Sequence, residues 1–82
     1  MAREVKVKVG GKDKHYTIYP LKGKHIRELL KAKKQGFDET FQVLEMAGIS
    51  ESDANEMDFR DCLMIQKEIN AETFGVEEEA KN

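Results

Sequence analysis

The chain has 82 residues, of which 39% are hydrophobic and 37% are charged, a balance typical of one small folded domain. No run of about 18 apolar residues is present, so we expect no membrane-spanning segment, and residues 1–11 lack the apolar stretch of a secretory signal. With a single cysteine, Cys62, the composition favours the cytoplasm over an oxidising compartment.

The net charge of −2 hides an uneven distribution along the chain. Residues 1–34 hold 11 Lys and Arg against 3 Asp and Glu, whereas residues 35–82 hold 3 against 13. A basic half and an acidic half could bind a charged partner, stack head to tail with copies of the same chain, or pack together and neutralise each other. The sequence leaves these three alternatives open.

The first two elements are predicted to be strands. Residues 3–9 alternate strictly, which places the valines on one face and the lysines on the other: Val5, Val7 and Val9 against Lys6 and Lys8. Residues 10–13 supply two glycines for a turn, and residues 14–20 alternate again up to Pro20. We therefore predict a β-hairpin whose valine face packs on helices, because an isolated hairpin is only marginally stable.

The segment from residue 22 to residue 36 predicts a basic amphipathic helix of about 11 residues. Its narrow apolar stripe is formed by Ile26, Leu29 and Leu30. The opposite side carries cations, namely Lys24, Arg27, Lys31 and Lys34. Gly36 is predicted to be the C-cap of this helix.

A second helix is predicted from Asp38, as its N-cap, to Gly48 behind its last turn. Phe41, Leu44 and Ala47 are expected to face inward. Residues 50–53 match a capping box, with Ser50 as N-cap and Asp53 in place of the usual glutamate, and predict a short helical turn.

The last helix is predicted from Phe59 to Phe74, with Asp58 as its N-cap and Gly75 behind it. Residues 76–82 are acidic and predict a disordered tail. The chain is therefore expected to be one α+β domain over residues 1–75, an N-terminal β-hairpin packed on about three α-helices.

The face of the last helix raises a question about function. A helical projection places two amides, Gln66 and Asn70, inside the apolar arc formed by Phe59, Cys62, Leu63, Ile65, Ile69 and Phe74. Buried amides need hydrogen-bond partners, so they either bond inside the fold or mark a surface that another polypeptide covers. Met64 projects to the other side, where an exposed methionine would suit a partner surface. The partner-binding candidates are Phe41, Met64, Gln66, Asn70 and Phe74.

The residues that catalysis or metal binding would need are not grouped in this sequence. His15, His25 and Cys62 lack the spacing of a zinc site, and residues 51–58 lack the central glycine of a calcium loop. No phosphate-binding loop is present, and Cys62 falls on an apolar helix face, where it acts as a small hydrophobe. We expect no enzyme activity, no metal and no cofactor.

Nucleic-acid binding through the basic half is the alternative function. The candidate electrostatic face combines Lys6 and Lys8 with Lys24, Arg27 and Lys31, and Tyr19 is the best stacking residue. A loose helix-turn-helix pattern around residues 43–57 does not add to this alternative, because its second helix would carry carboxylates and no cation and would repel phosphates.

The C-terminal half resembles the small tail assembly chaperones of long-tailed bacteriophages and prophages. The resemblance rests on Ser50 and Asp53, on the run Met57-Asp58-Phe59 with Asp61, and on Ile65-Gln66, Glu68-Ile69-Asn70 and Phe74 of the last helix. Residues 17–31, a strand followed by Pro20-Leu21 and an amphipathic helix, are similar to the same family. The resemblance implies a non-catalytic factor of the bacterial cytoplasm that binds the tape measure protein before the tail tube polymerises. The tail tube protein and further copies of the chain are additional candidate partners, and no nucleic acid or membrane is expected.

Overall fold

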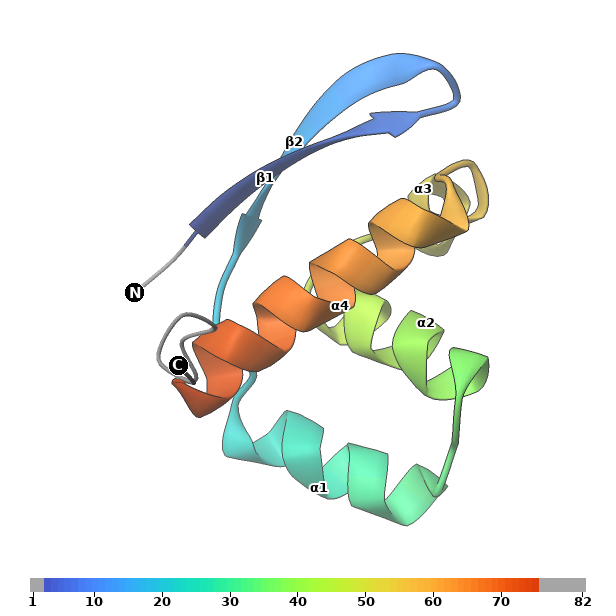
Figure 1. Cartoon of the computed structure of the whole chain (residues 1–82). Helices are drawn as coiled ribbons and strands as arrows, with labels where there is room; N and C mark the ends of the chain where they lie inside the picture. Colours follow the sequence, from blue (N-terminus) through green and yellow to red (C-terminus); the bar gives the residue numbers. More distant parts are fainter. Residues whose placement is uncertain (1–2, 76–82) are drawn as a thin grey trace, which may run out of the picture.

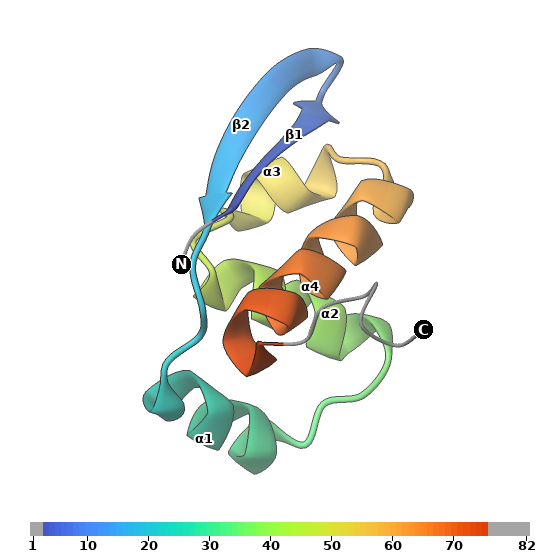
Figure 2. The same ribbon diagram turned by 60° about the vertical axis from the view of Figure 1, so that its left-hand side comes forward.

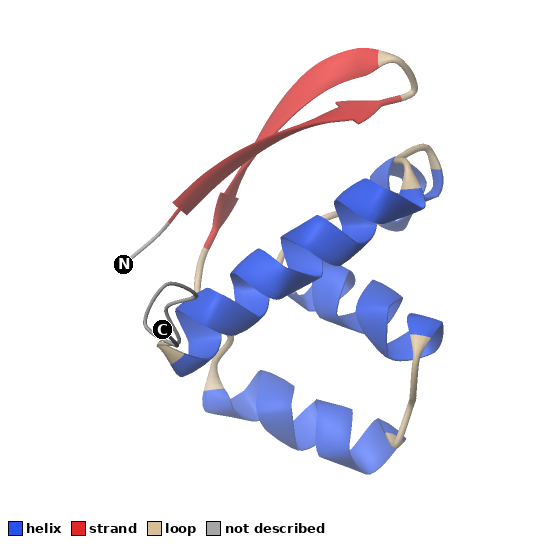
Figure 3. Ribbon diagram, in the orientation of Figure 1, coloured by secondary structure: helices blue, strands red, loops and turns tan. Residues whose placement is uncertain are grey.

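The structure is a computed structural model that describes residues 3–75, within which two strands precede four helices (Figures 1 and 3). The elements are β1 (Arg3–Val9), β2 (Lys12–Ile18), α1 (Gly23–Ala32), α2 (Phe37–Met46), α3 (Glu51–Asn55) and α4 (Phe59–Phe74). The predicted α+β class is confirmed, and the short turn predicted after Ser50 forms α3. The predicted acidic tail, residues 76–82, lies outside the described residues.

The long helix α4 organises the fold, because other elements cover it on two sides. The hairpin runs along one side of α4, and α2 packs on another side (Figures 1 and 2). The short α3 lies near the hairpin turn, whereas α1 lies at the opposite end of the molecule (Figures 1 and 2). None of the residues of α1 is fully buried.

The hairpin forms because its alternation and its turn agree. The strands pair antiparallel with Val5 opposite Tyr16. Gly10 and Gly11 form a two-residue turn with φ values of +60° and +85°, and a turn of this kind requires positive φ at both positions. Strand β2 therefore begins at Lys12, two residues earlier than predicted. The turn is attached to the helices where the Gly10 N–H donates to the Glu56 carbonyl oxygen at 3.0 Å.

The core lies between the hairpin and helices α2, α3 and α4. Its least exposed large side chains are Ile18, Leu44, Ile49, Ile65, Ile69 and Cys62. Burial raises the pKa of the Cys62 thiol, so this cysteine remains protonated and acts as an apolar core group, as expected.

The boundary between α1 and α2 differs from the prediction. Helix α1 ends at Ala32, and Lys33 caps it in the left-handed conformation with φ +54°. Gly36, predicted as the C-cap of this helix, is instead the N-cap of α2 with φ +61°. Helix α2 consequently begins at Phe37, so Asp38 lies in its first turn and is not its cap. A glycine between two helices can cap the end of the first or the start of the second. Residues 33–36 form the connection between α1 and α2.

The predicted caps of the later helices are confirmed in their positions. The Asp53 N–H donates to Ser50 Oγ at 3.1 Å, and Gly75 caps α4 with φ +69°. The Asp53 carboxylate does not complete a capping box, because it accepts hydrogen bonds from Lys14 Nζ and from the Tyr16 hydroxyl of β2. These bonds tie the hairpin to α3.

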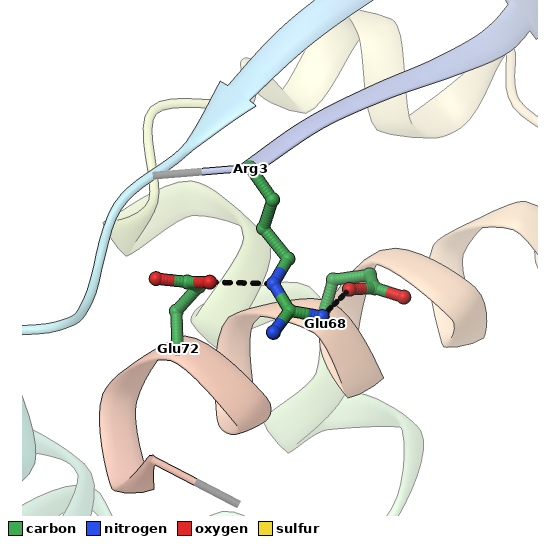
Figure 4. Close-up of polar contacts among 3 residues, drawn as sticks. All are labelled: Arg3, Glu68 and Glu72. Carbon is green, nitrogen blue, oxygen red and sulfur yellow. Dashed lines mark hydrogen bonds and ion pairs between the residues drawn. The ribbon is translucent and has the colours of Figure 1, made fainter. Parts of the chain in front are cut away.

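Two glutamates of α4 hold the first residue of β1. Arg3 donates from Nε to Glu72 and from Nη1 to Glu68, each at 2.5 Å (Figure 4). The hairpin therefore covers the side of α4 that carries these two glutamates. With the Lys14–Asp53 pair, these contacts partly neutralise the two oppositely charged halves.

The Asp53 contacts predict a stability that depends on pH. The Lys14 ammonium and then the Tyr16 hydroxyl lower the pKa of the Asp53 carboxyl below its ordinary value. The contribution of these bonds is therefore present above about pH 4, the ordinary pKa of an aspartate, and is lost as the pH falls through the lower folded value. We expect Asp53→Asn to lower the urea midpoint at pH 7, with the difference from wild type shrinking toward pH 2. Glu45→Gln, at an exposed position, is the control. A difference that stays constant with pH would contradict this account.

Candidate functional site

One side of α4 remains uncovered and carries two large apolar side chains, Leu63 and Phe74, with the polar Lys67 and Asn70 between them along the helix. Leu63 and Phe74 have exposed fractions of 43% and 63%, and Asn70 is exposed between them. Their spacings of seven and four residues place all three on one helical face. We call these three residues the α4 strip. A contiguous exposed apolar patch marks a surface that another polypeptide covers, and Leu63 and Phe74 are the large apolar side chains that α4 offers to such a patch.

The apolar surface continues from α4 onto the start of α2. Phe37 is 67% exposed and lies edge-on against Phe59, with ring centroids 4.8 Å apart. Phe59 also contacts Phe41, at a centroid distance of 5.8 Å. The three rings form a cluster at the N-terminal end of α4, and the exposed Phe37 ring extends the apolar surface beyond the α4 strip.

The two amides of α4 have different environments. Gln66 is half-buried, and its Oε1 accepts a hydrogen bond of 2.8 Å from the hydroxyl of Thr40, which is 3% exposed. Asn70 is exposed on the α4 strip. Gln66 therefore links α2 to α4 inside the fold, and only Asn70 is available to a partner.

The predicted partner-binding residues do not form one surface. Asn70 and Phe74 belong to the α4 strip, whereas Phe41 and Gln66 lie between helices. Met64 was expected to be exposed, but it is half-buried against the core. Leu63 and Phe37 were missed as surface residues. The helical projection places Leu63 on the same face as Asn70 and Phe74. The exposure of any one of these three residues would therefore have identified the other two as surface residues.

The predicted electrostatic face is divided between the two ends of the molecule. Lys6 and Lys8 lie on the outer face of the hairpin, near the Asp13 carboxylate at 3.9 and 3.0 Å. Lys24, Arg27 and Lys31 lie on α1 at the other end (Figure 2). The five cations therefore form no continuous groove for a nucleic-acid backbone.

A hollow of about 610 Å³ lies where the β2–α1 connection meets the end of α2. Its lining is mostly apolar: Tyr19, Pro20, Leu21, Lys22, His25, Met46, Ala47 and Gly48. His25 Nδ1 accepts a hydrogen bond of 3.1 Å from the Lys22 N–H, so this ring caps the start of α1. No carboxylate, hydroxyl nucleophile or thiol from the described residues lines this hollow, apart from the phenol of Tyr19.

The described residues bring together no group of three or more His, Cys, Asp and Glu side chains that could hold a metal ion. Across residues 3–75, no helix is both long enough and apolar enough to cross a lipid bilayer. Comparisons with models of protein families, with curated proteins and with solved structures give no match.

Proposed function

We propose that this protein is a non-catalytic binding protein that covers an apolar helical segment of another polypeptide through the α4 strip and Phe37. More particularly, we propose a tail assembly chaperone that holds the tape measure protein of a long-tailed bacteriophage in the bacterial cytoplasm before the tail tube forms. The tail tube protein is a second candidate partner.

The observation that carries the proposal is the exposure of Leu63 and Phe74 on one face of a helix that is otherwise well covered. A few well-packed anchor side chains, often aromatic, supply most of the affinity in protein interfaces. A partner helix that buries such side chains binds through positions spaced three or four residues apart. A tape measure protein fits this requirement, because a long helical polypeptide exposes apolar surface until the tube encloses it.

The motifs shared with tail assembly chaperones support the particular partner. Residues of these motifs build the ends and the interior of α3 and α4, as Ser50 caps α3 and Gln66 joins α4 to α2. The motifs therefore specify the scaffold that holds the α4 strip. Phe74, the last residue of the motif, lies on the strip itself.

Co-purification tests the proposal. The full chain is co-expressed with a tape measure protein encoded in the same genome, and we expect the two proteins to elute together. The double variant Leu63→Asp/Phe74→Ser should lose at least about 30-fold in affinity, because hot-spot truncations at interfaces cost about 2 kcal/mol or more. Calorimetric titration of the purified proteins measures this loss.

Tyr19→Ser is the matched control, since Tyr19 is 63% exposed but lies on the β2–α1 connection, outside the α4 strip. It should bind as wild type does. Thermal unfolding of each variant verifies that the fold is retained. No association of the wild-type protein with the tape measure protein, or equal losses from the strip variant and the control, would overturn the proposal.

A further inference from the structure

The helix α1 presents cations that have no partner in the described part of the chain. Residues 22–34 contain six lysines and arginines and one glutamate. None of the six forms an ion pair within residues 3–75, whereas Arg3 and Lys14 do. Near the end of α1, Leu30 is 71% exposed, with Arg27 one turn earlier on the helix and Lys31 as the next residue, also exposed. We call Leu30, Arg27 and Lys31 the basic end.

A hollow with side chains of opposite charge lies between α2 and α3. This hollow of about 200 Å³ is lined by Phe41, Glu45, Glu51, Ala54 and Asn55, and we call it the acidic hollow. Phe41 and Ala54 supply its apolar lining, and Glu45 and Glu51 are exposed. A cavity of about 150 Å³ holds a benzene ring, so the acidic hollow has room for the four carbons of a leucine side chain.

The wider charge distribution follows the same division. Residues 37–61, which include α2 and α3, contain eight aspartates and glutamates and one arginine. Helices α1 and α3 lie at opposite ends of the molecule with α2 between them (Figures 1 and 2). Asp53 in this range is paired with Lys14 of the hairpin, whereas Glu45 and Glu51 of the acidic hollow form no ion pair with the cations of α1 in the described part of the chain.

We propose that copies of this chain associate head to tail, with Leu30 of one copy entering the acidic hollow of the next. Arg27 and Lys31 then face Glu45 and Glu51. Burial of Leu30 stabilises the contact, and the opposite charges set its orientation. Because the two surfaces differ, each copy keeps one surface free, and the contact continues into a filament or closes into a ring.

A second copy satisfies these features better than a nucleic acid does. Phosphates would neutralise the cations of α1, but they would face the apolar side chain of Leu30 and leave the acidic hollow without a ligand. A second copy buries Leu30 and pairs both sets of charges. This inference does not depend on the proposed function, because none of its residues belongs to the α4 strip.

Sedimentation velocity of the full chain over a range of protein concentrations tests the proposal. In about 0.01 M salt, we expect the average size of the wild type to grow with concentration. In about 1 M salt the growth should be reduced, because the screening length falls from about 30 Å to about 3 Å. Leu30→Ser should weaken the association at least about tenfold, while Tyr19→Ser, at an exposed position outside both surfaces, leaves it unchanged.

A charge exchange identifies the two surfaces. Arg27→Glu/Lys31→Glu and Glu45→Lys/Glu51→Lys should each be monomeric alone, since like charges then meet across the contact. An equimolar mixture should form larger species again, because the reversed charges complement each other. Circular dichroism verifies that both double variants are folded; should one fail to fold, the Leu30→Ser and Tyr19→Ser pair tests the same contact.

A wild type that stays monomeric at every concentration in low salt would overturn the proposal, as would a mixture that stays monomeric. A 30-nucleotide single-stranded DNA is the second probe. Its binding by the wild type and loss with Arg27→Glu/Lys31→Glu, without any self-association, would assign these cations to nucleic acid and would also overturn the proposal.

Discussion

Replacing Ile65 by alanine is expected to lower the free energy of unfolding by about 2–5 kcal/mol, the usual effect of removing a large aliphatic side chain from a core. Ile65 has an exposed fraction of 0% in the middle of α4. It lies in the same buried cluster as Cys62, Ile69 and residues of the hairpin and α2. The shorter alanine side chain leaves a cavity in the core. Because the hairpin and α2 hold α4 from opposite sides, the surrounding side chains cannot move far enough to fill this cavity. Urea unfolding followed by circular dichroism measures the change.

The effect should remove a large part of the total stability, since small domains have about 5–15 kcal/mol. Leu63→Ala provides the control, because it truncates a side chain of similar size two residues earlier on the same helix. With 43% of Leu63 exposed, we expect a loss of less than about 1 kcal/mol. Equal losses from the two variants would show that the hairpin and α2 do not cover α4 as described.

The hydrogen bond between Thr40 and Gln66 is expected to produce the second large effect. Thr40→Val keeps the shape of the side chain but leaves the half-buried Gln66 Oε1 without its donor. We expect a loss of about 1–3 kcal/mol, the cost of an unsatisfied buried polar group. Gln66→Leu should cost less, because the Thr40 hydroxyl can still donate to the Gly36 carbonyl oxygen, which lies 3.3 Å away.

The double variant Thr40→Val/Gln66→Leu distinguishes a hydrogen bond from simple packing. Replacing both polar partners by apolar groups is often nearly neutral, so the double variant should be more stable than Thr40→Val alone. Unfolding of the four proteins in urea gives the coupling energy. Losses that simply add would mean that Gln66 contributes only its packing to the contact between α2 and α4.

Local patterns predicted the strands and most helix ends, because these features depend on neighbouring residues. The alternation of valine and lysine has the period of a strand, and the two glycines that follow suit a hairpin turn. Ser50 and Gly75 mark helix ends through their own backbone and side-chain chemistry. Gly36 was misplaced because it stands between two helices, and only the position of α2 decides which one it caps.

The exposed surface was harder to predict. A helical projection assumes that one continuous arc of a helix is buried, and it centres that arc on the apolar residues of the helix. Helix α4 is covered from two sides, and the hairpin brings Arg3 against Glu68 and Glu72. This contact turns a charged side of α4 inward and leaves Leu63 and Phe74 facing solvent. The sequence contains no local signal for it, because Arg3 is far from both glutamates along the chain.

This long-range contact also limits when the protein can reach its final form during synthesis. Arg3 is separated from Glu68 and Glu72 by 65 and 69 positions, so the first strand cannot be secured until α4 has left the ribosome. At about 5–20 residues per second, the hairpin must wait several seconds with its valine face uncovered. The nascent chain is therefore most vulnerable to aggregation before its last helix emerges.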